Sequence, residues 1–137
     1  VVFISAAVYL IKDVTYNYFL LIPAVVLVSG THALIGIRLS YSTKDFTSLL
    51  VSFMAYAFIF FVPSIFLLFG IISADYANLL IVLPPETASI LIRAGFEETQ
   101  LWKIIFGYVY LIALSFVLYR YSVKPKFNEY LVKEMGV

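Results

Sequence analysis

The chain contains no cysteine and a single histidine among its 137 residues. Without cysteine there is neither a disulfide framework nor a thiolate metal site. A metal centre would need several His, Cys or carboxylate groups to converge, and the long apolar segments offer only His32. We therefore expect no metal site.

Charge is equally scarce. Asp, Glu, Lys and Arg make up 12% of the residues, whereas apolar residues make up 64%, and the mean hydropathy is +1.04. A soluble domain of this size does not tolerate such a composition. The formal net charge of +1 also argues against a nucleic-acid partner. The composition indicates an integral membrane protein, with the lipid bilayer as its main surroundings.

Two long segments, 19–37 and 49–72, lack any Asp, Glu, Lys or Arg. A hydrocarbon core of about 30 Å needs roughly 20 helical residues, and both segments are close to or above that length. In a third segment Lys103 and Arg120 lie near the two ends, where each can snorkel to a headgroup layer. We predict three spans: 18–38, 48–72 and 101–121. A membrane β-barrel would show alternating polarity instead, so the expected fold is an all-α polytopic transmembrane helix bundle.

The first residues need a separate interpretation. Residues 1–11 form an unbroken apolar run that is too short to span, and the chain does not begin with Met. A signal peptide would carry a basic segment before the run and small residues at a cleavage site after it. We expect the end of a truncated span, which makes the chain a fragment that forms one transmembrane domain.

Positive charge in short loops sets the orientation of a membrane protein. One side carries Arg38, Lys44, Arg120, Lys124, Lys126 and Lys133; the other carries Lys12, Arg93 and Lys103. The richer side predicts a cytoplasmic location for the polar turn at 41–46 and for a tail at 122–137. The protein is then a multi-pass protein of the plasma membrane with a cytoplasmic C-terminus.

Helices in lipid associate through small residues and polar contacts. Small residues recur at helical spacing in the first two spans: Ser29, Ala33, Gly36 and Ser40, then Ser48, Ser52 and Ala55. We predict that these two faces pack on each other.

Three further side chains are candidates for a transport pathway or a helix interface. His32 lies on the small-residue face, as a proton relay or substrate contact or as a neutral imidazole bonded to a neighbouring helix. Tyr108 and Ser115 share a face of the last span with Tyr119. They line a polar pathway in one interpretation, whereas tyrosines near helix ends more commonly form the interfacial aromatic belt.

Residues 76–95 are too apolar for a solvated loop and too broken to span, because Pro84 and Pro85 interrupt them. The pieces on either side would be helices of roughly 10 and 14 Å. Glu86 complements a helix N-terminus and Gly95 suits a helix end. We expect an external helical pair that is either re-entrant or surface-lying.

Enzyme signatures are missing from the sequence. The G-x-x-x-x-G-K-[ST], H-E-x-x-H and G-x-S-x-G patterns do not occur, and no carboxylate pair lies within a span. We therefore expect no catalytic residue and no cofactor.

Two segments carry a family resemblance. The permease subunits of ABC type-2 exporters have fourth and fifth spans that are similar to ALIGIRLSYSTKDFTSLLVSFMAYAFIFFVPSIFLLFG. Their proline-bearing external re-entrant helices, between spans five and six, resemble IVLPPETASILIRAGF, and residues 101–126 resemble their last span. The ILIRAGF portion also resembles bacterial and archaeal drug-export permeases of this group, such as the fluoroquinolone export permeases.

This resemblance implies the C-terminal part of a six-span permease that moves an amphiphilic drug, lipid or peptide. Its partners would be a second permease half, identical or different, and two ATP-binding subunits that hydrolyse the ATP. Lys44 and Asp45 would then contact an ATPase, although solvated loop charges are the commoner state of such residues. Two alternatives remain: a secondary transporter half without an ATPase, and a structural membrane subunit.

Overall fold

The computed structural model describes residues 17–73 and 76–135. Its regular elements are all helical: α2 (Tyr18–Tyr41), α3 (Phe46–Leu68), α4 (Ala77–Leu80), α5 (Pro84–Arg93), α6 (Leu101–Val117), the π-helical η2 (Leu118–Val123) and α7 (Lys124–Met135). No strand occurs in these two ranges, which confirms the all-α prediction. The truncated span expected at 1–11 lies outside the described residues.

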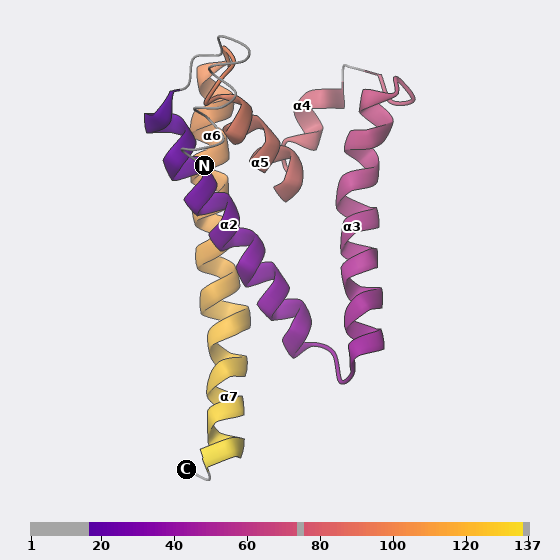
Figure 1. Ribbon diagram of the computed structural model, residues 1–137, viewed down its shortest axis with the longest axis vertical. Helices are drawn as coiled ribbons and strands as arrows, with labels where there is room; N and C mark the ends of the chain where they lie inside the picture. The colour runs from indigo at the N-terminus through magenta and orange to yellow at the C-terminus, as the bar shows by residue number, and fades with distance from the viewer. Residues whose placement is uncertain (1–16, 74–75, 136–137) are drawn as a thin grey trace, which may run out of the picture.

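The helices form an open arrangement (Figure 1). Helices α2 and α6 pack against each other at an angle, and α3 lies beside them. A tight turn joins α2 to α3, and we name this end of the molecule the turn end. At the opposite end, named the hairpin end, α4 and α5 fill the space between α3 and the α2–α6 pair.

Three helices are long and apolar enough to cross a membrane: Tyr18–Tyr41, Phe46–Leu68 and Leu101–Glu129. The chain is therefore a multi-pass membrane protein. The second span was predicted to continue to residue 72 but ends at Leu68. Gly70 causes this end, because its φ of 69° lies in the left-handed region. The N–H of Ile71 donates to Phe66 O and that of Gly70 to Leu67 O, which is the Schellman arrangement.

The last helix is longer than the sequence predicted. Residues 122–137 were expected to form a tail after the span, but α6, η2 and α7 continue as one helix to Met135. The N–H of Lys124 donates to Tyr119 O five positions earlier, the pattern of a π-helical turn. Pro125 follows directly after this turn and donates no backbone hydrogen bond.

The buried core joins α2, α5 and α6, and α3 takes no part in it. Ala24 of α2, Leu91 of α5 and Leu111 of α6 form one cluster, and none of the three is more than 1% exposed. Helix α3 contributes no buried residue along its length. The molecule therefore consists of a packed α2–α5–α6 block with α3 attached more loosely beside it.

Close backbone approach holds this block together at two glycines. A Cβ added to Gly107 would lie 2.9 Å from Leu91 Cδ2, and one added to Gly95 would lie 2.9 Å from Leu21 Cβ. Real Cβ atoms do not come this close to a neighbour, so a larger residue at either position would force its neighbour to shift. Gly107 lets α6 lie against α5, and Gly95 lets the end of the α5 segment lie against α2.

The predicted packing between the small-residue faces of α2 and α3 is wrong for most of its residues. Ser29, Ala33 and Ser40 are exposed. Only Gly36 approaches α3, where an added Cβ would lie 3.7 Å from Phe53 Cζ. Helix α2 instead buries a different face, against α5 and α6. That buried face consists of Leu21, Ala24 and Thr31.

Candidate functional site

The α4–α5 segment folds back on itself as a hairpin beside α6. The Tyr110 hydroxyl donates to Val82 O at 2.6 Å. Tyr110 follows the start of α6 by nine positions, which places it about 14 Å along the helix. At the other end of the hairpin the Asn17 N–H donates to Gly95 O at 2.7 Å, level with the start of α2. The hairpin apex thus lies beside α6 about 14 Å from the start of that helix.

The apex of this hairpin satisfies its own polar groups. Pro84 and Pro85 open α5, where no N–H is required, and both are buried. The hydroxyl of Thr87, which is 0% exposed, donates to Ile81 O and also lies 3.3 Å from Leu83 O. Backbone that does not span is tolerated at membrane depth only where protein or a water-filled cavity surrounds it. The hairpin meets this condition by packing against α2 and α6.

A groove separates the hairpin from α3. Its volume is about 410 Å³, and its lining comes from α3 (Phe61, Ser64, Ile65, Leu67 and Leu68) and from α5 (Glu86, Ser89 and Arg93). Glu86 Oε1 lies 3.7 Å from Arg93 Nη2, and the two side chains are 16% and 51% exposed. The Ser64 hydroxyl is enclosed without a hydrogen-bond partner in the described chain. The α5 wall of the groove is thus polar, with one ion pair and Ser89, whereas the α3 wall is apolar except for Ser64.

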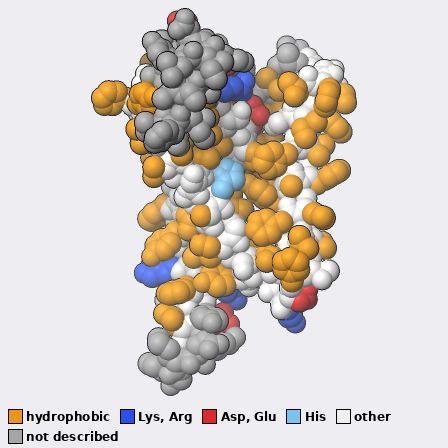
Figure 2. Space-filling view, in the orientation of Figure 1, with side chains coloured by type: hydrophobic (Ala, Val, Ile, Leu, Met, Phe, Trp, Pro, Cys, Tyr) orange, Lys and Arg blue, Asp and Glu red, His pale blue; other side chains and the backbone are white. Residues whose placement is uncertain are grey.

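His32 lies between α2 and α3, where Figure 2 shows its side chain in pale blue at the surface. Its Nδ1 is 2.9 Å from Val28 O. Because a carbonyl oxygen only accepts, Nδ1 carries the hydrogen and Nε2 has the free lone pair in the neutral ring. The half-buried ring therefore keeps one acceptor nitrogen, Nε2.

Tyr108 and Ser115, proposed from the sequence as pathway or interface residues, both bond to α2. The Tyr108 hydroxyl donates to Leu20 O at 2.7 Å, and the Ser115 hydroxyl lies 2.7 Å from that of Thr31. Tyr119, on the same face by spacing, is 52% exposed and makes no such contact. The first two hydroxyls connect α6 to α2.

Ser29 and Ser52 do not meet each other or a common site. Ser29 is exposed. The Ser52 hydroxyl donates to Ser48 O of its own helix at 2.8 Å. Neither side chain contributes to the groove.

Lys44 and Asp45 are exposed in the turn between α2 and α3. Asp45 caps α3: its carboxylate accepts from the Ser48 N–H at 2.8 Å. This hydrogen bond lowers the pKa of Asp45 from its ordinary value of 3.8. Asp45 thus has a structural role that the sequence analysis did not assign to it.

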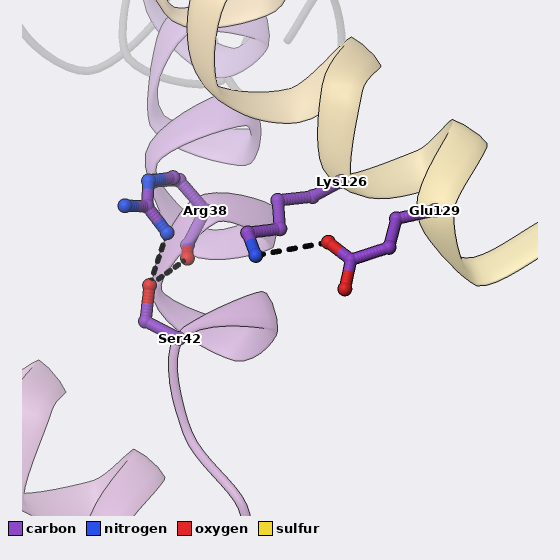
Figure 3. Close-up of polar contacts among 4 residues, drawn as sticks. All are labelled: Arg38, Ser42, Lys126 and Glu129. Atoms are coloured by element: carbon purple, nitrogen blue, oxygen red, sulfur yellow. Dashed lines mark hydrogen bonds and ion pairs between the residues drawn. The ribbon is translucent and has the colours of Figure 1, made fainter.

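The turn end also collects basic side chains from two helices (Figure 3). Arg38 of α2 donates to the Ser42 hydroxyl, which in turn donates to Arg38 O at 2.8 Å. On α7, Lys126 Nζ lies 3.0 Å from Glu129 Oε2. These contacts hold cationic groups of α2 and α7 at one end of the bundle.

Sequence reasoning missed the residues that matter most at the groove and the core. Thr31 was not considered in the sequence analysis. Glu86 was assigned only to the helix dipole, and Arg93 only to the charge count. The spacing of these two charges was an available signal, because an acid and a base seven positions apart share one face of α5.

Comparison of the chain with known protein families, curated proteins and solved structures gave no match.

Proposed function

We propose that this chain is part of the permease of an ATP-driven exporter of the ABC type-2 kind, which moves an amphiphilic molecule across the plasma membrane. The observation that carries the proposal is the re-entrant α4–α5 hairpin, seated between α3 and the α2–α6 pair. A proline-broken segment at half depth is costly in lipid and is retained where it borders a pathway.

The order of the elements supports the same proposal. A span, a short polar turn, a second span, a re-entrant pair and a last span follow one another along the chain. This is the order that the resemblance to ABC type-2 permeases implies. Because no catalytic residue is expected, ATP hydrolysis belongs to separate ATP-binding subunits, which act with a second permease half.

The charges of the turn end supply the orientation. Arg38 and Lys126 lie there with the exposed Lys44, so the positive-inside rule places this end in the cytoplasm. In this orientation the hairpin end and its groove face outward. Lys44 and Asp45 are then available to an ATPase on the cytoplasmic side.

The loose attachment of α3 allows it to move against the α2–α5–α6 block during transport. Helices α2, α5 and α6 share a buried core, whereas α3 buries no residue and connects to α2 through a short turn. Closure of the ATPase subunits would rotate α3 against this block, and the groove beside the hairpin would change width. Transport then follows from the relative position of two rigid parts.

The experiment uses the full-length protein with its ATPase in inside-out vesicles. These 137 residues contain no cysteine, so in an otherwise cysteine-free full-length protein Ser64→Cys and Ser89→Cys can be joined across the groove with a reducible thiol cross-linker. We expect ATP-dependent uptake to fall at least tenfold on cross-linking and to return on reduction, while each single-cysteine variant keeps its uptake. Uptake that continues unchanged in the cross-linked protein contradicts the proposal.

A second candidate function is a secondary transporter, which the free Nε2 of His32 favours. A neutral imidazole with one committed nitrogen can take a proton on the other. In that case an uncoupler abolishes uptake while ATP removal does not, and His32→Gln removes the proton dependence. The ATP-driven exporter predicts the reverse response to ATP removal and to the uncoupler.

A further inference from the structure

The groove between α3 and α5 has the size of a small-molecule site. Its volume of about 410 Å³ falls within the roughly 300–1,000 Å³ that is common for drug-sized ligands. Ile65, Leu67 and Leu68 supply an apolar wall along α3. Glu86, Ser89 and Arg93 supply polar groups from α5 on the opposite wall. Such a groove suits a molecule with one apolar and one polar part.

Glu86 retains free acceptor capacity. Its closest oxygen lies 3.7 Å from Arg93 Nη2, which exceeds the 2.7–2.9 Å typical of a charged N–H···O bond. No hydrogen bond to the carboxylate comes from elsewhere in the described chain. A carboxylate that is mostly enclosed and only loosely paired is costly in a membrane protein unless another cation joins it.

The depth of the two charges favours a cation over an anion. Glu86 follows the buried apex prolines directly, whereas Arg93 ends α5 close to the level of Gly95. The Arg93 side chain is 51% exposed and the Glu86 side chain 16%. Electrostatic attraction is stronger at the less solvated group, so Glu86 governs the sign of the ligand charge.

Two neighbours complete a cation site. Phe61 contributes an aromatic ring to the lining, and aromatic rings attract cations. The enclosed Ser64 hydroxyl has no partner in the described chain and can accept or donate a hydrogen bond. We propose that the α3–α5 groove binds an amphiphilic cation, with its positive group against Glu86 and Phe61 and its apolar body along α3. This proposal rests on the proposed function and names the substrate class of that exporter.

The test measures binding of tetraphenylphosphonium, a lipophilic cation, to the full-length protein in lipid nanodiscs. We expect Glu86→Gln to weaken binding at least tenfold, while the matched control Glu98→Gln, outside the groove on an exposed residue, leaves it unchanged. Arg93→Gln removes the internal competitor for Glu86 and is expected to tighten binding. Unchanged binding in Glu86→Gln, in a variant that elutes and folds like the parent protein, overturns the proposal.

Phenylalanine variants supply an independent check. Phe61→Leu is expected to weaken tetraphenylphosphonium binding roughly two- to fivefold, the size of one exposed cation–π contact. Phe58 also belongs to α3, is 71% exposed and does not line the groove, so Phe58→Leu is the control. Equal effects of the two substitutions would show that the ring makes no specific contact.

Binding of taurocholate, an anionic amphiphile, tests whether the groove selects anions instead of cations. If taurocholate binds more tightly than tetraphenylphosphonium and only Arg93→Gln abolishes its binding, the groove is an anion site and the proposal is wrong. Transport separates this proposal from the proposed function. Glu86-dependent binding without ATP-driven uptake contradicts the exporter alone, whereas ATP-driven uptake without Glu86-dependent binding contradicts the cation site alone.

Discussion

The hydroxyls of Thr31 and Ser115 lie 2.7 Å apart, although 84 residues separate them along the chain. Thr31 is 0% exposed, and its Oγ1 also donates to Leu27 O at 2.8 Å. A threonine hydroxyl has one hydrogen, so Ser115 must be the donor in the bond between the helices. This bond fixes the rotation of α6 against α2 at the middle of both spans.

Removal of either hydroxyl is expected to destabilise the α2–α6 contact. Thr31→Val and Ser115→Ala should show a coupling energy of about 0.6–1.7 kcal/mol in a double-mutant cycle, the range measured for hydrogen bonds between membrane helices. Denaturant unfolding in detergent micelles measures it. Ser29→Ala, on an exposed hydroxyl, should be neutral, and a coupling energy near zero would mean that the two hydroxyls do not interact.

A side chain at Gly107 should loosen the hairpin. In Gly107→Ala the new methyl would lie 2.9 Å from Leu91 Cδ2 and 3.3 Å from Thr87 Cγ2. Overpacking of this kind costs about 1–3 kcal/mol. The midpoint of thermal or denaturant unfolding should therefore be lower in Gly107→Ala than in the parent protein, and lower still in Gly107→Leu.

Gly30 provides the matched control for Gly107. It also lies inside a transmembrane helix, but an added Cβ there meets no atom within 4 Å. Gly30→Ala should therefore be neutral or slightly stabilising, since alanine is the better helix former. Leu91→Ala combined with Gly107→Ala should cost less than the sum of the two single changes, and strict additivity would argue against the clash.

The Tyr110 hydroxyl should hold the hairpin apex in place. Tyr110→Phe removes the 2.6 Å bond to Val82 O, so the apex should open more often. In a protein without native cysteine, labelling of Val82→Cys by a water-soluble maleimide is expected to speed up severalfold. Tyr108→Phe, which loses a bond to Leu20 O instead, should leave this rate unchanged. Equal rates in all three proteins would mean that the tyrosine does not restrain the apex.

The start of α3 should depend on pH through Asp45. Because the folded-state pKa of Asp45 is lowered, its cap stabilises the fold above the ordinary pKa of 3.8 and is lost as the pH falls through the lower folded value. The free energy of unfolding of the parent protein should fall between about pH 5 and about pH 2 by more than that of Asp45→Asn. Asparagine caps equally well but does not titrate, so parallel pH curves would contradict this role.

The spans were predictable from sequence because lipid imposes a simple rule of length and polarity. The charge-free runs before and after residues 41–46 correspond to α2 and α3, and Pro84 with Pro85 marked the re-entrant segment. The last span was predicted to end at residue 121, but η2 and α7 continue the helix to Met135. The basic residues after the span predicted a tail and gave no sign that this tail is helical.

The contacts between helices were not predictable, because they depend on which faces meet. Ser29 and Thr31 are both small hydroxyl residues of one helix, yet only Thr31 faces α6. Gly107 and Gly36 look alike in sequence, and the close approach of Leu91 singles out Gly107. Such choices follow from the placement of α5, which a single sequence does not encode by periodicity.

The unbroken helix from Leu101 to Met135 is about 50 Å long, well beyond a hydrocarbon core of about 30 Å. Gly107 and Tyr110, which contact the hairpin, lie near one end of this helix, and Lys126 lies near the other. With a helical rise of about 1.5 Å per residue, a tilt of about 10° about the contact at Gly107 would displace the end of α7 by about 7 Å. A large movement at α7 therefore needs only a small rotation where α6 packs against the hairpin.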